Sequence, residues 1–595
     1  MSDKINYILD SLSLQQQEIV KSSANLLVTA CPGSGKTRVL TRKLAFTVAN
    51  NTTSRKKIIA ITYTNRAAEE IKDRLGFLDI EHPAIWAGTI HQFCLEYIIR
   101  PNAMFVPELS KGYKIIDEYV SEKYVQQIVK EMSLNIDFFD ILKINKALDD
   151  KMQPLETRYR AVSEKYHDIL SANKEIDFDL ILSYSIHILR TNTLPAESLA
   201  RTIGSIYVDE YQDTNELQYE IIGCLTKKNT KINMMFVGDV DQAIYESLGG
   251  VPKTREEIEC ITGLRFELAT LSGCYRSTQR IVDYYSYYKE ADYKIQSLSH
   301  DKMVTGNIQL NCTINKENVY NAIAQIISDK LSKGIPQNEI CVIAPRWEIL
   351  FPLSKALRQL LPEVTFDAPG ISPIRSDDMN VFYKFSKIIF TEPGKKVSRR
   401  KRIASEVIQM LFNDFDISLP MHIDSFWVLD KINSINPSTE NGIEYFEIIM
   451  KKFLDDCGIK EESYPLLFEQ FADFIDKINY RLERYSELSN ELDSFKKMFE
   501  ERYGVVVTSC HSIKGEEYDT VIAFGILKGF IPHWDAVFNS SDFGENEARK
   551  MLYVIASRAK KSLYLFSERG RFTQSKSEYR ITDILGNYNY AYDIY

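Results

Sequence analysis

The sequence lacks the features of membrane and secreted proteins. No run of about 18 consecutive apolar residues could form a membrane-spanning helix. The opening residues, MSDKINYILDSLSLQQQ, lack the basic start and apolar core of a signal peptide. The nine cysteines include no C-x-x-C pair, and the eight histidines show no H-x₃-H or H-E-x-x-H spacing. We therefore expect a cytoplasmic protein with reduced thiols, no membrane association and no zinc site.

An excess of positive charge is also absent. The chain has 73 Lys and Arg residues against 82 Asp and Glu residues, a net charge of −9. This balance argues against nonspecific coating of nucleic acid, but a local positive groove is compatible with it. With 595 residues, 44% hydrophobic and 26% charged, the chain has the composition of a globular protein of about four structural units.

Short apolar runs alternate with helical patterns along most of the chain. The runs are ANLLVTA, KKIIAITYT, SIYVDE, NMMFVGD, NEICVIAP, DTVIAFG and SLYLF. Each is β-branched and too short for a helix, so the alternation predicts an α/β fold with parallel sheets flanked by helices. The runs fall into two clusters, each interrupted by a helix-rich stretch without strand signals. We expect a first core at 1–93 and 196–275, its helical insertion at 94–195, a second core at 276–389 and 503–595, and its helical insertion at 390–502.

The segment ACPGSGKTR follows one apolar run and precedes a helical pattern, which is the context of a P-loop. Gly33 and Gly35 let the backbone N–H groups face a phosphate, Lys36 adds positive charge, and Thr37 offers a hydroxyl to Mg²⁺. The first glycine of the usual G-x₄-G-K-T is Ala30 here. A glycine-rich turn without a ligand would leave the lysine unexplained. The nucleotide-binding residues expected here are Ala30, Cys31, Pro32, Gly33, Ser34, Gly35, Lys36, Thr37 and Arg38.

Two further apolar runs end in carboxylates. IYVDEYQDT places Asp209 and Glu210 at a strand end, where Asp209 would hold Mg²⁺ and Glu210 would polarise the attacking water. MMFVGDVDQ places Asp239, Asp241 and Gln242 at another. A carboxylate pair after a strand is by itself common, but combined with the P-loop it predicts an NTPase.

With VDEYQDT the motifs become specific, and over most of its length the chain resembles the UvrD/Rep/PcrA branch of superfamily 1 DNA helicases. The matching blocks follow the family's order: LSLQQQEIV, ACPGSGKTR, ITYTNRAAEEIKDRL, GTIHQF, VDEYQDT, VGDVDQAIY, CYRST, HSIKGEEYD and YVIASRA. The resemblance implies an ATP-driven motor that unwinds DNA in the 3′-to-5′ direction. It would have two RecA-like domains, each with a helical insertion, and ATP and Mg²⁺ would bind between them.

The resemblance also assigns roles to single residues. It implies Lys36, Asp209, Glu210, Gln242, Arg276 and Arg558 as the catalytic set, with the two arginines from the second core clamping the γ-phosphate. Gln16 would read the adenine edge, Tyr275 would stack on adenine and Glu517 would hold the ribose. The implied contacts to single-stranded DNA and its junction with duplex are Tyr63, Thr64, Asn65, Thr89, His91, Thr508 and His511. Without these motifs, the simplest interpretation of Arg276 and Arg558 would be surface ion pairs. The simplest interpretation of Tyr275, His91 and His511 would be core residues.

The chain departs from the family after DQAIY. Ser247 and Leu248 stand where relatives have a Trp-Arg pair, whose tryptophan stacks on DNA and whose arginine links DNA to the ATP site. Losing a stacking platform weakens DNA binding by about 1–3 kcal/mol. Two interpretations stay open: a working helicase that grips DNA through other aromatics such as Tyr63, or a DNA-stimulated ATPase subunit of a larger complex. The second resembles the helicase partners of nucleases in Gabija-like anti-phage systems; the chain itself has no recognisable nuclease motif.

Two other stretches are open to more than one interpretation. The basic residues that begin the second insertion would contact duplex phosphates or form a solvated loop. They are Lys395, Lys396, Arg399, Arg400, Lys401 and Arg402. The tail GNYNYAYDIY would dock on a partner, form a frayed end or pack as a final strand, and YYSYYKEADY would be a helix face in the core.

Overall fold

The computed structural model of the chain describes residues 2–50, 56–78, 80, 82–134, 157–245, 249–368, 372–485, 488–500, 502–534, 541–573 and 575–594. The chain divides into two compact units. The first comprises Met1–Tyr275 and Glu290–Gln296, and the second comprises Arg276–Lys289 and Ser297–Tyr595.

The first unit is built on a sheet of six parallel strands in the order β3-β2-β6-β7-β1-β8. The strands are β1 (Leu26–Ala30), β2 (Lys57–Thr62), β3 (Ile85–Thr89), β6 (Ile203–Asp209), β7 (Asn233–Gly238) and β8 (Glu267–Leu271). The inner strands are buried along most of their length, which explains their continuous apolar sequences. Because the strands are parallel, β1, β6 and β7 deliver their carboxyl ends to one edge of the sheet.

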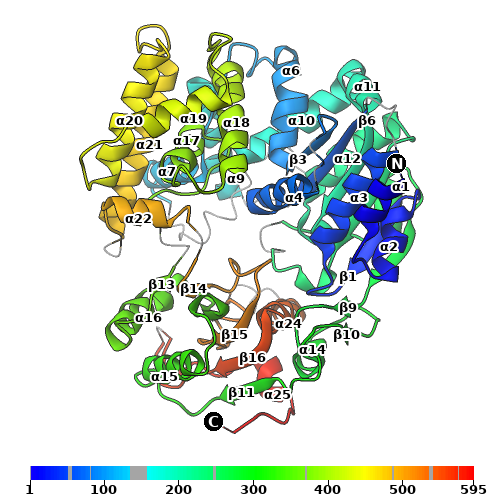
Figure 1. Ribbon diagram of the computed structural model, residues 1–595, viewed down its shortest axis with the longest axis vertical. Coiled ribbons are helices and arrows are strands. Elements are labelled where there is room, and N and C mark those ends of the chain that lie inside the picture. The colour runs from blue at the N-terminus through cyan, green and yellow to red at the C-terminus, as the bar shows by residue number, and fades with distance from the viewer. Residues whose placement is uncertain are drawn as a thin grey trace. The chain divides into compact units, whose positions relative to one another are not determined.

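Helices cover this sheet (Figure 1). The helices of this unit are α1 (Ser2–Leu9), α2 (Leu14–Lys21), α3 (Lys36–Asn50), α4 (Asn65–Phe77), α5 (Ile90–Phe93), α6 (Arg100–Asn102), α7 (Glu118–Glu131), α9 (Thr157–Asn173), α10 (Phe178–Thr191), α11 (Thr193–Thr202), α12 (Glu216–Lys228) and α13 (Arg255–Thr262). Of these, α7 and α9 pack on each other instead of on the sheet. Helix α3 packs through Val39, Leu40 and Leu44 against the apolar side chains of β1. Helix α2 begins with a capping box in which Ser13 and Gln16 satisfy each other's backbone N–H groups.

The stretch expected to be a helix-rich insertion without strands also contains two short ones. Strands β4 (Lys114–Ile115) and β5 (Glu175–Ile176) form a two-residue parallel pair, and a π-helix occupies Cys94–Ile99. Segments of two residues are too short to show the alternation from which a strand is predicted. The domain limits derived from the sequence stay a prediction.

The second unit is built on another sheet of six parallel strands, in the order β11-β16-β15-β12-β14-β13. They are β11 (Asn307–Asn311), β12 (Ile340–Ala344), β13 (Phe366–Asp367), β14 (Val505–Ser509), β15 (Tyr518–Ala523) and β16 (Ala559–Phe566). Helices α15 (Val319–Ser332) and α16 (Trp347–Leu360) share one apolar core with this sheet. Figure 1 shows α14 (Gln279–Ser286) and α24 (Ser541–Ala556) on its other side. The short strands β9 (Gly273–Cys274) and β10 (Gln296–Ser297) and the helix α25 (Asp583–Asn587) complete the elements.

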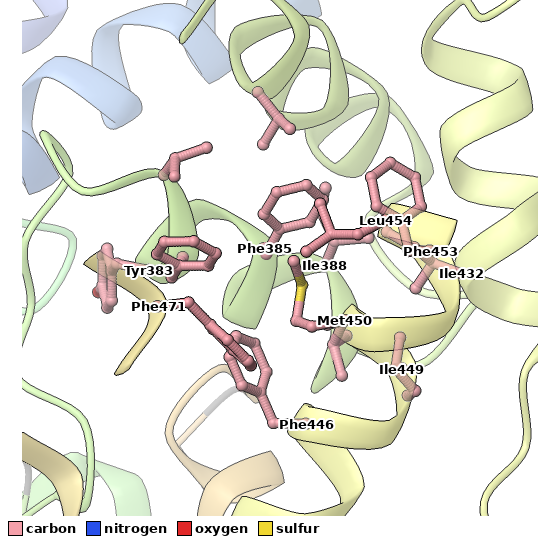
Figure 2. Packing of buried hydrophobic residues seen from close by; sticks show 14 of the residues in the cluster. Tyr383, Phe385, Ile388, Ile432, Phe446, Ile449, Met450, Phe453, Leu454 and Phe471 are labelled. Carbon is pink, nitrogen blue, oxygen red and sulfur yellow. The ribbon is translucent and has the colours of Figure 1, made fainter. Parts of the chain in front are cut away.

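A group of six helices within the second unit has its own core. They are α17 (Val381–Ile389), α18 (Val397–Phe415), α19 (Ser425–Ser434), α20 (Gly442–Asp456), α21 (Pro465–Arg484) and α22 (Leu492–Lys497). Figure 2 shows Phe385 of α17, Phe446 and Met450 of α20 and Phe471 of α21 directed into this core. Fully burying each such side chain contributes about 1.5–3 kcal/mol, so the group is held by its own apolar contacts.

The predicted fold class is confirmed: two parallel-sheet α/β cores of RecA-like type, with helical segments inserted into their chain. Every run predicted as a buried strand is a strand, at β1, β2, β6, β7, β12, β15 and β16. In the described part of the chain, no helix has the length and apolar character needed to cross a membrane.

Candidate active site

The predicted P-loop connects β1 to α3 at the carboxyl edge of the first sheet. Ala30 ends β1, and Lys36 and Thr37 begin α3. Gly33 and Gly35 have φ angles of 71° and 79°, a left-handed backbone conformation that residues other than glycine rarely adopt. The loop therefore presents backbone N–H groups at the start of a helix, where the helix dipole also favours an anion.

Two neighbouring segments fix the shape of this loop. The Gln16 side-chain amide donates to the carbonyl of Ser34 at 2.9 Å, and the Tyr275 N–H donates to the carbonyl of Gly33 at 2.8 Å. Cys31 and Pro32 are buried at its start, and burial raises the pKa of the Cys31 thiol well above its usual value. The thiol is neutral at physiological pH, so Cys31 has a packing role in the loop.

Acidic residues at the ends of β6 and β7 face the loop. The Lys36 ammonium lies 3.4 Å from the Glu210 carboxylate, and both side chains are mostly buried. Glu210 has a φ of 52°, a strained backbone conformation of the kind that concentrates at functional sites. The structure therefore brings three members of the predicted catalytic set together: Lys36, Asp209 and Glu210.

Gln212 connects the two acidic strand ends and was not predicted as a site residue. Its amide donates to Glu210 at 2.6 Å, and its carbonyl oxygen accepts the N–H of Asp239 at 3.1 Å. A Cβ atom on Gly238 would lie 2.2 Å from that oxygen, so glycine is required for this close approach. The signal in the sequence was an amide two residues after a carboxylate, in the stretch E-Y-Q-D.

The third predicted acidic segment contributes Asp239 and Gln242. Gln242 is buried and donates to Asp239 at 2.6 Å. Asp241 has a different task, because its carboxylate accepts the backbone N–H of Glu290 at 2.7 Å and so anchors a later segment of the same unit. The segment thus divides into two residues at the site, Asp239 and Gln242, and one that holds the chain.

Burial concentrates unfavourable negative charge at this edge. It raises the pKa of Asp209 to about 7, assisted by the charge of Glu210 and opposed by Lys36. It also raises the pKa of Asp239 to about 7, again against the pull of Lys36. Buried carboxylates whose ionised form is disfavoured are stabilised when a cation binds next to them.

The donors at this edge fit Mg²⁺ in the way nucleotide-hydrolysing enzymes hold it. Mg²⁺ takes one or two carboxylates and hydroxyls and completes its shell with water and substrate phosphates. Asp209 and the Thr37 hydroxyl are such donors. Among the described residues no cluster of three or more His, Cys, Asp or Glu side chains could hold a metal ion.

The residues of the first unit that were predicted to contact the nucleotide near its adenine differ in exposure and in hydrogen bonding. Tyr275 is 42% exposed, so its ring is accessible to a base. Arg38 donates to the carbonyl of Ser11 at 3.0 Å, and Gln16 is buried with its amide committed to the P-loop. Gln16 therefore supports the phosphate loop, whatever contact it makes to a base.

The arginines predicted for the γ-phosphate clamp lie in the second unit. Arg276 donates to Glu517 at 2.7 Å and to the carbonyl of Ser557 at 2.8 Å. Arg558 is fully buried and donates to the carbonyls of Val554 and Glu516, at 3.1 and 3.4 Å. The structure thus brings Arg276 together with Glu517, the residue predicted to hold the ribose.

The charge of Glu517 is stabilised by its surroundings. Burial alone would raise the pKa of this carboxyl, but Arg276, Lys560 and Arg558 lower it below its usual value. The side chain is 46% exposed, with Oε2 bonded to Arg276 and Oε1 lying 3.7 Å from the Lys560 ammonium.

The predicted DNA contacts of the first unit lie at the ends of β2 and β3. The Tyr63 ring, 38% exposed, stacks on Tyr245 with centroids 5.0 Å apart. The hydroxyls of Thr64 and Thr89 cap α4 and α5 by accepting backbone N–H groups. The structure thus brings Tyr63 and Tyr245 together as an aromatic pair, while both threonines have a structural task.

The remaining predicted DNA contacts are less accessible. Asn65 begins α4, and its buried side-chain oxygen has no hydrogen-bond partner in the described structure. His91 packs edge-on against Phe178 at 5.5 Å, and burial lowers its pKa to about 4. Thr508 is buried within β14, and burial also lowers the pKa of His511 in the turn that follows. Ser247 and Leu248, the positions of the departure from the family, lie outside the described residues.

The basic cluster at the start of the second insertion is partly structural. Arg400 is buried and donates to the carbonyls of Ile388 and Pro393 and to the side chain of Asn433. Lys401 lies over the ring of Phe426 at 4.2 Å. Arg400 therefore joins helices of the second insertion. The prediction that the basic cluster binds phosphates or forms a solvated loop is wrong for this residue.

The fold and the site define a class: a nucleotide-hydrolysing P-loop protein with two RecA-like cores. Comparison with known families narrows it. Residues 12–259 match the UvrD/REP helicase N-terminal domain, and residues 434–570 match the UvrD-like helicase C-terminal domain. The chain belongs to the UvrD/Rep/PcrA-like family of superfamily 1 helicases.

Curated relatives agree over nearly the whole chain. The ATP-dependent DNA helicase PcrA of Staphylococcus epidermidis is 25% identical over 659 aligned positions, covering 96% of this chain and 86% of the relative. The ATP-dependent DNA helicase PcrA of Staphylococcus aureus is 25% identical over 646 positions, covering 94% of this chain and 84% of the relative.

Proposed function

We propose that this protein is an ATP-dependent DNA helicase that moves along single-stranded DNA in the 3′-to-5′ direction and unwinds duplex. The observation that carries the proposal is the acidic edge facing the P-loop, where Lys36 pairs with Glu210 at 3.4 Å beside Asp209. Acidic side chains at this position serve a protein that binds nucleotide phosphates and activates a water molecule for attack. The names of the relatives and the family matches support DNA as the polymer along which the protein moves.

The chemistry follows from these side chains. The N–H groups of the loop and Lys36 hold the β- and γ-phosphates, and Glu210 orients the attacking water and accepts its proton. Asp209 and the Thr37 hydroxyl would hold Mg²⁺, whose charge, once bound, neutralises phosphate oxygens. Gln212 and Lys36 fix the Glu210 carboxylate from two sides, so its position does not depend on the substrate.

The remaining nucleotide contacts belong to the same proposal. Gln242, held by Asp239, contacts the γ-phosphate. Arg276 and Arg558 of the second unit complete the charge clamp, because a guanidinium stays ionised and matches phosphate oxygens in shape. Tyr275 stacks on adenine and Glu517 contacts the ribose. Removing an arginine of this kind typically costs 10³–10⁵ in rate.

DNA is proposed to contact the ends of β2, β3 and β14. The accessible Tyr63, stacked on Tyr245, provides a platform for a base, and such stacking is worth about 1–3 kcal/mol whatever the base. This aromatic pair supports the first of the two interpretations, in which other aromatics replace the missing tryptophan. Thr64, Asn65, Thr89 and His91 of the first unit, and Thr508 and His511 of the second, are proposed as further DNA contacts.

The proposal is tested by ATP hydrolysis with and without single-stranded DNA, and by strand displacement from duplexes with a 3′ or a 5′ tail. We expect hydrolysis stimulated by DNA, and displacement of the 3′-tailed duplex alone. Displacement from the 5′ tail alone would overturn the polarity. Intact hydrolysis with no displacement from either duplex would favour the alternative, an ATPase subunit that works with a nuclease.

A further inference from the structure

A mostly buried ion pair lies where the chain returns from the helical group α17–α22 to the second sheet. Arg502 stands just before β14, and Glu516 lies in the connection from β14 to β15. Arg502 Nη1 donates to both carboxylate oxygens of Glu516, at 2.9 and 3.1 Å, and the Tyr518 hydroxyl donates to Oε2. The Glu516 side chain is 6% exposed, so its position is fixed by these donors and not by solvent.

The segment around Glu516 is bonded to both of the proposed clamp arginines, to Arg558 through its backbone and to Arg276 through the side chain of Glu517. Arg558 Nη1 donates to the Glu516 carbonyl at 3.4 Å. The Tyr518 N–H donates to the Arg558 carbonyl at 3.0 Å. Between these two residues, Glu517 accepts the Arg276 Nε–H at 2.7 Å. Three consecutive residues thus connect Arg502 to Arg276 and Arg558.

The connection that carries these contacts is held by short turn bonds and by the buried side chain of Glu516. Gly515, directly before Glu516, has a φ of 86°, a conformation that glycine adopts without cost. The Glu516 N–H makes one turn contact, to the Ile513 carbonyl at 3.0 Å. The buried side chain of Glu516 is therefore a main constraint on where the following peptide units lie.

We infer that Arg502 and Glu516 are a positioning pair, which sets the places of Arg276 and Arg558 without contacting the nucleotide. The inference rests on the proposed function, because it takes the two arginines as the phosphate clamp. It adds that this clamp is tied to the point where the chain leaves the helical group. Neither Arg502 nor Glu516 is among the site residues predicted from the motifs.

Steady-state ATP hydrolysis by the 595-residue protein tests the inference with three single variants and one double variant. Glu516→Gln keeps the size of the side chain, Arg502→Gln leaves a shorter polar side chain, and each removes the ion pair. We expect each to lower kcat roughly ten-fold while KM for ATP changes less than about two-fold, because the arginines act on the transition state more than on binding. Arg502→Lys keeps the charge and should recover most of kcat. The double variant Arg502→Gln/Glu516→Gln should have a kcat no lower than that of the less active single variant, because the two residues act as a unit.

A matched control separates positioning from stability. Lys384 is also a buried cation of the second unit, 3.2 Å from Asp378 and 2.7 Å from Glu406. Lys384→Met should lower the melting temperature and leave kcat of the folded protein unchanged. If it lowers kcat as much as Arg502→Gln at equal stability, or if Arg502→Gln leaves kcat unchanged, the positioning role is overturned.

Hydrogen exchange provides a readout that does not depend on catalysis. Exchange at the Tyr518 amide, which is bonded to Arg558, should quicken in Arg502→Gln and not in Lys384→Met. If the unaltered protein does not hydrolyse ATP, the proposed function falls, and this measurement still decides whether the pair holds the arginine segment. Unchanged exchange at Tyr518 would overturn the inference.

Discussion

Lys36 of the P-loop and Glu210 after β6 are partners, with ammonium and carboxylate 3.4 Å apart. The pair places the proposed general base at the phosphate end of the loop and holds it there from one side, while Gln212 holds it from the other. The two residues nevertheless have separable tasks, since one binds phosphate and the other activates water. Substitution should separate these tasks.

Lys36→Ala should reduce both nucleotide affinity and hydrolysis, because it removes the positive charge at the β- and γ-phosphates. Glu210→Gln should keep nucleotide affinity and lose roughly 10²–10⁴ in turnover, the usual contribution of a general base. Binding of a fluorescent ATP analogue and steady-state hydrolysis measure the two effects. Lys165→Ala removes an exposed lysine paired with Glu131 and should behave as the unaltered protein does. Full turnover in Glu210→Gln would contradict the assignment of the base.

Gly238→Ala should impair the site without removing any functional group. Its Cβ would lie 2.2 Å from the Gln212 oxygen and 2.7 Å from the ring of Tyr211, so Gln212 must move away from Glu210. Overpacking of this kind costs about 1–3 kcal/mol of folding stability, and displaced Gln212 should also lower turnover. Thermal denaturation and ATP hydrolysis measure the two effects.

Gly76→Ala is the matched control for Gly238→Ala. Gly76 lies in α4, and a Cβ there meets no atom within 4 Å. Alanine at such a helical position stabilises by about 0.5–1 kcal/mol. Equal activity of the two alanine variants would show that Gln212 does not act on Glu210.

Much of the fold could be predicted because buried parallel strands are continuous apolar runs. The runs ending in Ala30, Asp209 and Gly238 were such strands, and parallel pairing brings their ends together. Edge strands gave less signal: β8 is exposed at several positions, and β13 has only two residues. Their place in the sheet depends on pairing partners distant in the sequence.

The site could be predicted where a motif carries the chemistry, and not where a contact depends on the fold. Lys36, Asp209 and Glu210 were identified from local patterns. Gln212 bonds a residue on another strand, and Arg502 reaches Glu516 across a whole strand and loop. Such partners are set by the topology.

His91 should make stability depend on pH in the acid range. Burial lowers its pKa to about 4, while an unfolded histidine titrates near 6.5. Between these values the unfolded chain binds more protons, so the free energy of unfolding falls as pH falls from about 6.5 to 4. The loss is at most about 3 kcal/mol. His91→Gln should flatten this slope in thermal denaturation, and His187→Gln, at an exposed position on α10, should not. The same slope in both variants would contradict a buried neutral His91.

The tyrosine-rich tail packs on α14 of its own unit. The ring of Tyr588 stacks on that of Tyr287, with centroids 3.7 Å apart and planes 3° apart, and Tyr590 packs edge-on against Tyr284 at 4.9 Å. Asp593 accepts two hydrogen bonds from Arg280. Residues 588–594 of the tail therefore pack on their own unit, without forming the final strand that was one expectation for them.

Tyr588→Ala should therefore loosen α14, because it removes the ring that covers Tyr287. Aromatic pairs contribute about 0.5–1.5 kcal/mol beyond the area they bury, so we expect a loss of about 1–3 kcal/mol. Hydrogen exchange should show faster opening of the α14 amides, since local unfolding follows the stability of the local contacts. Tyr588→Phe keeps the ring and loses only the hydroxyl, so its α14 should exchange at the unaltered rate. If both variants exchange alike, stacking is not what holds the tail, and the ion pair of Arg280 with Asp593 would remain as its anchor.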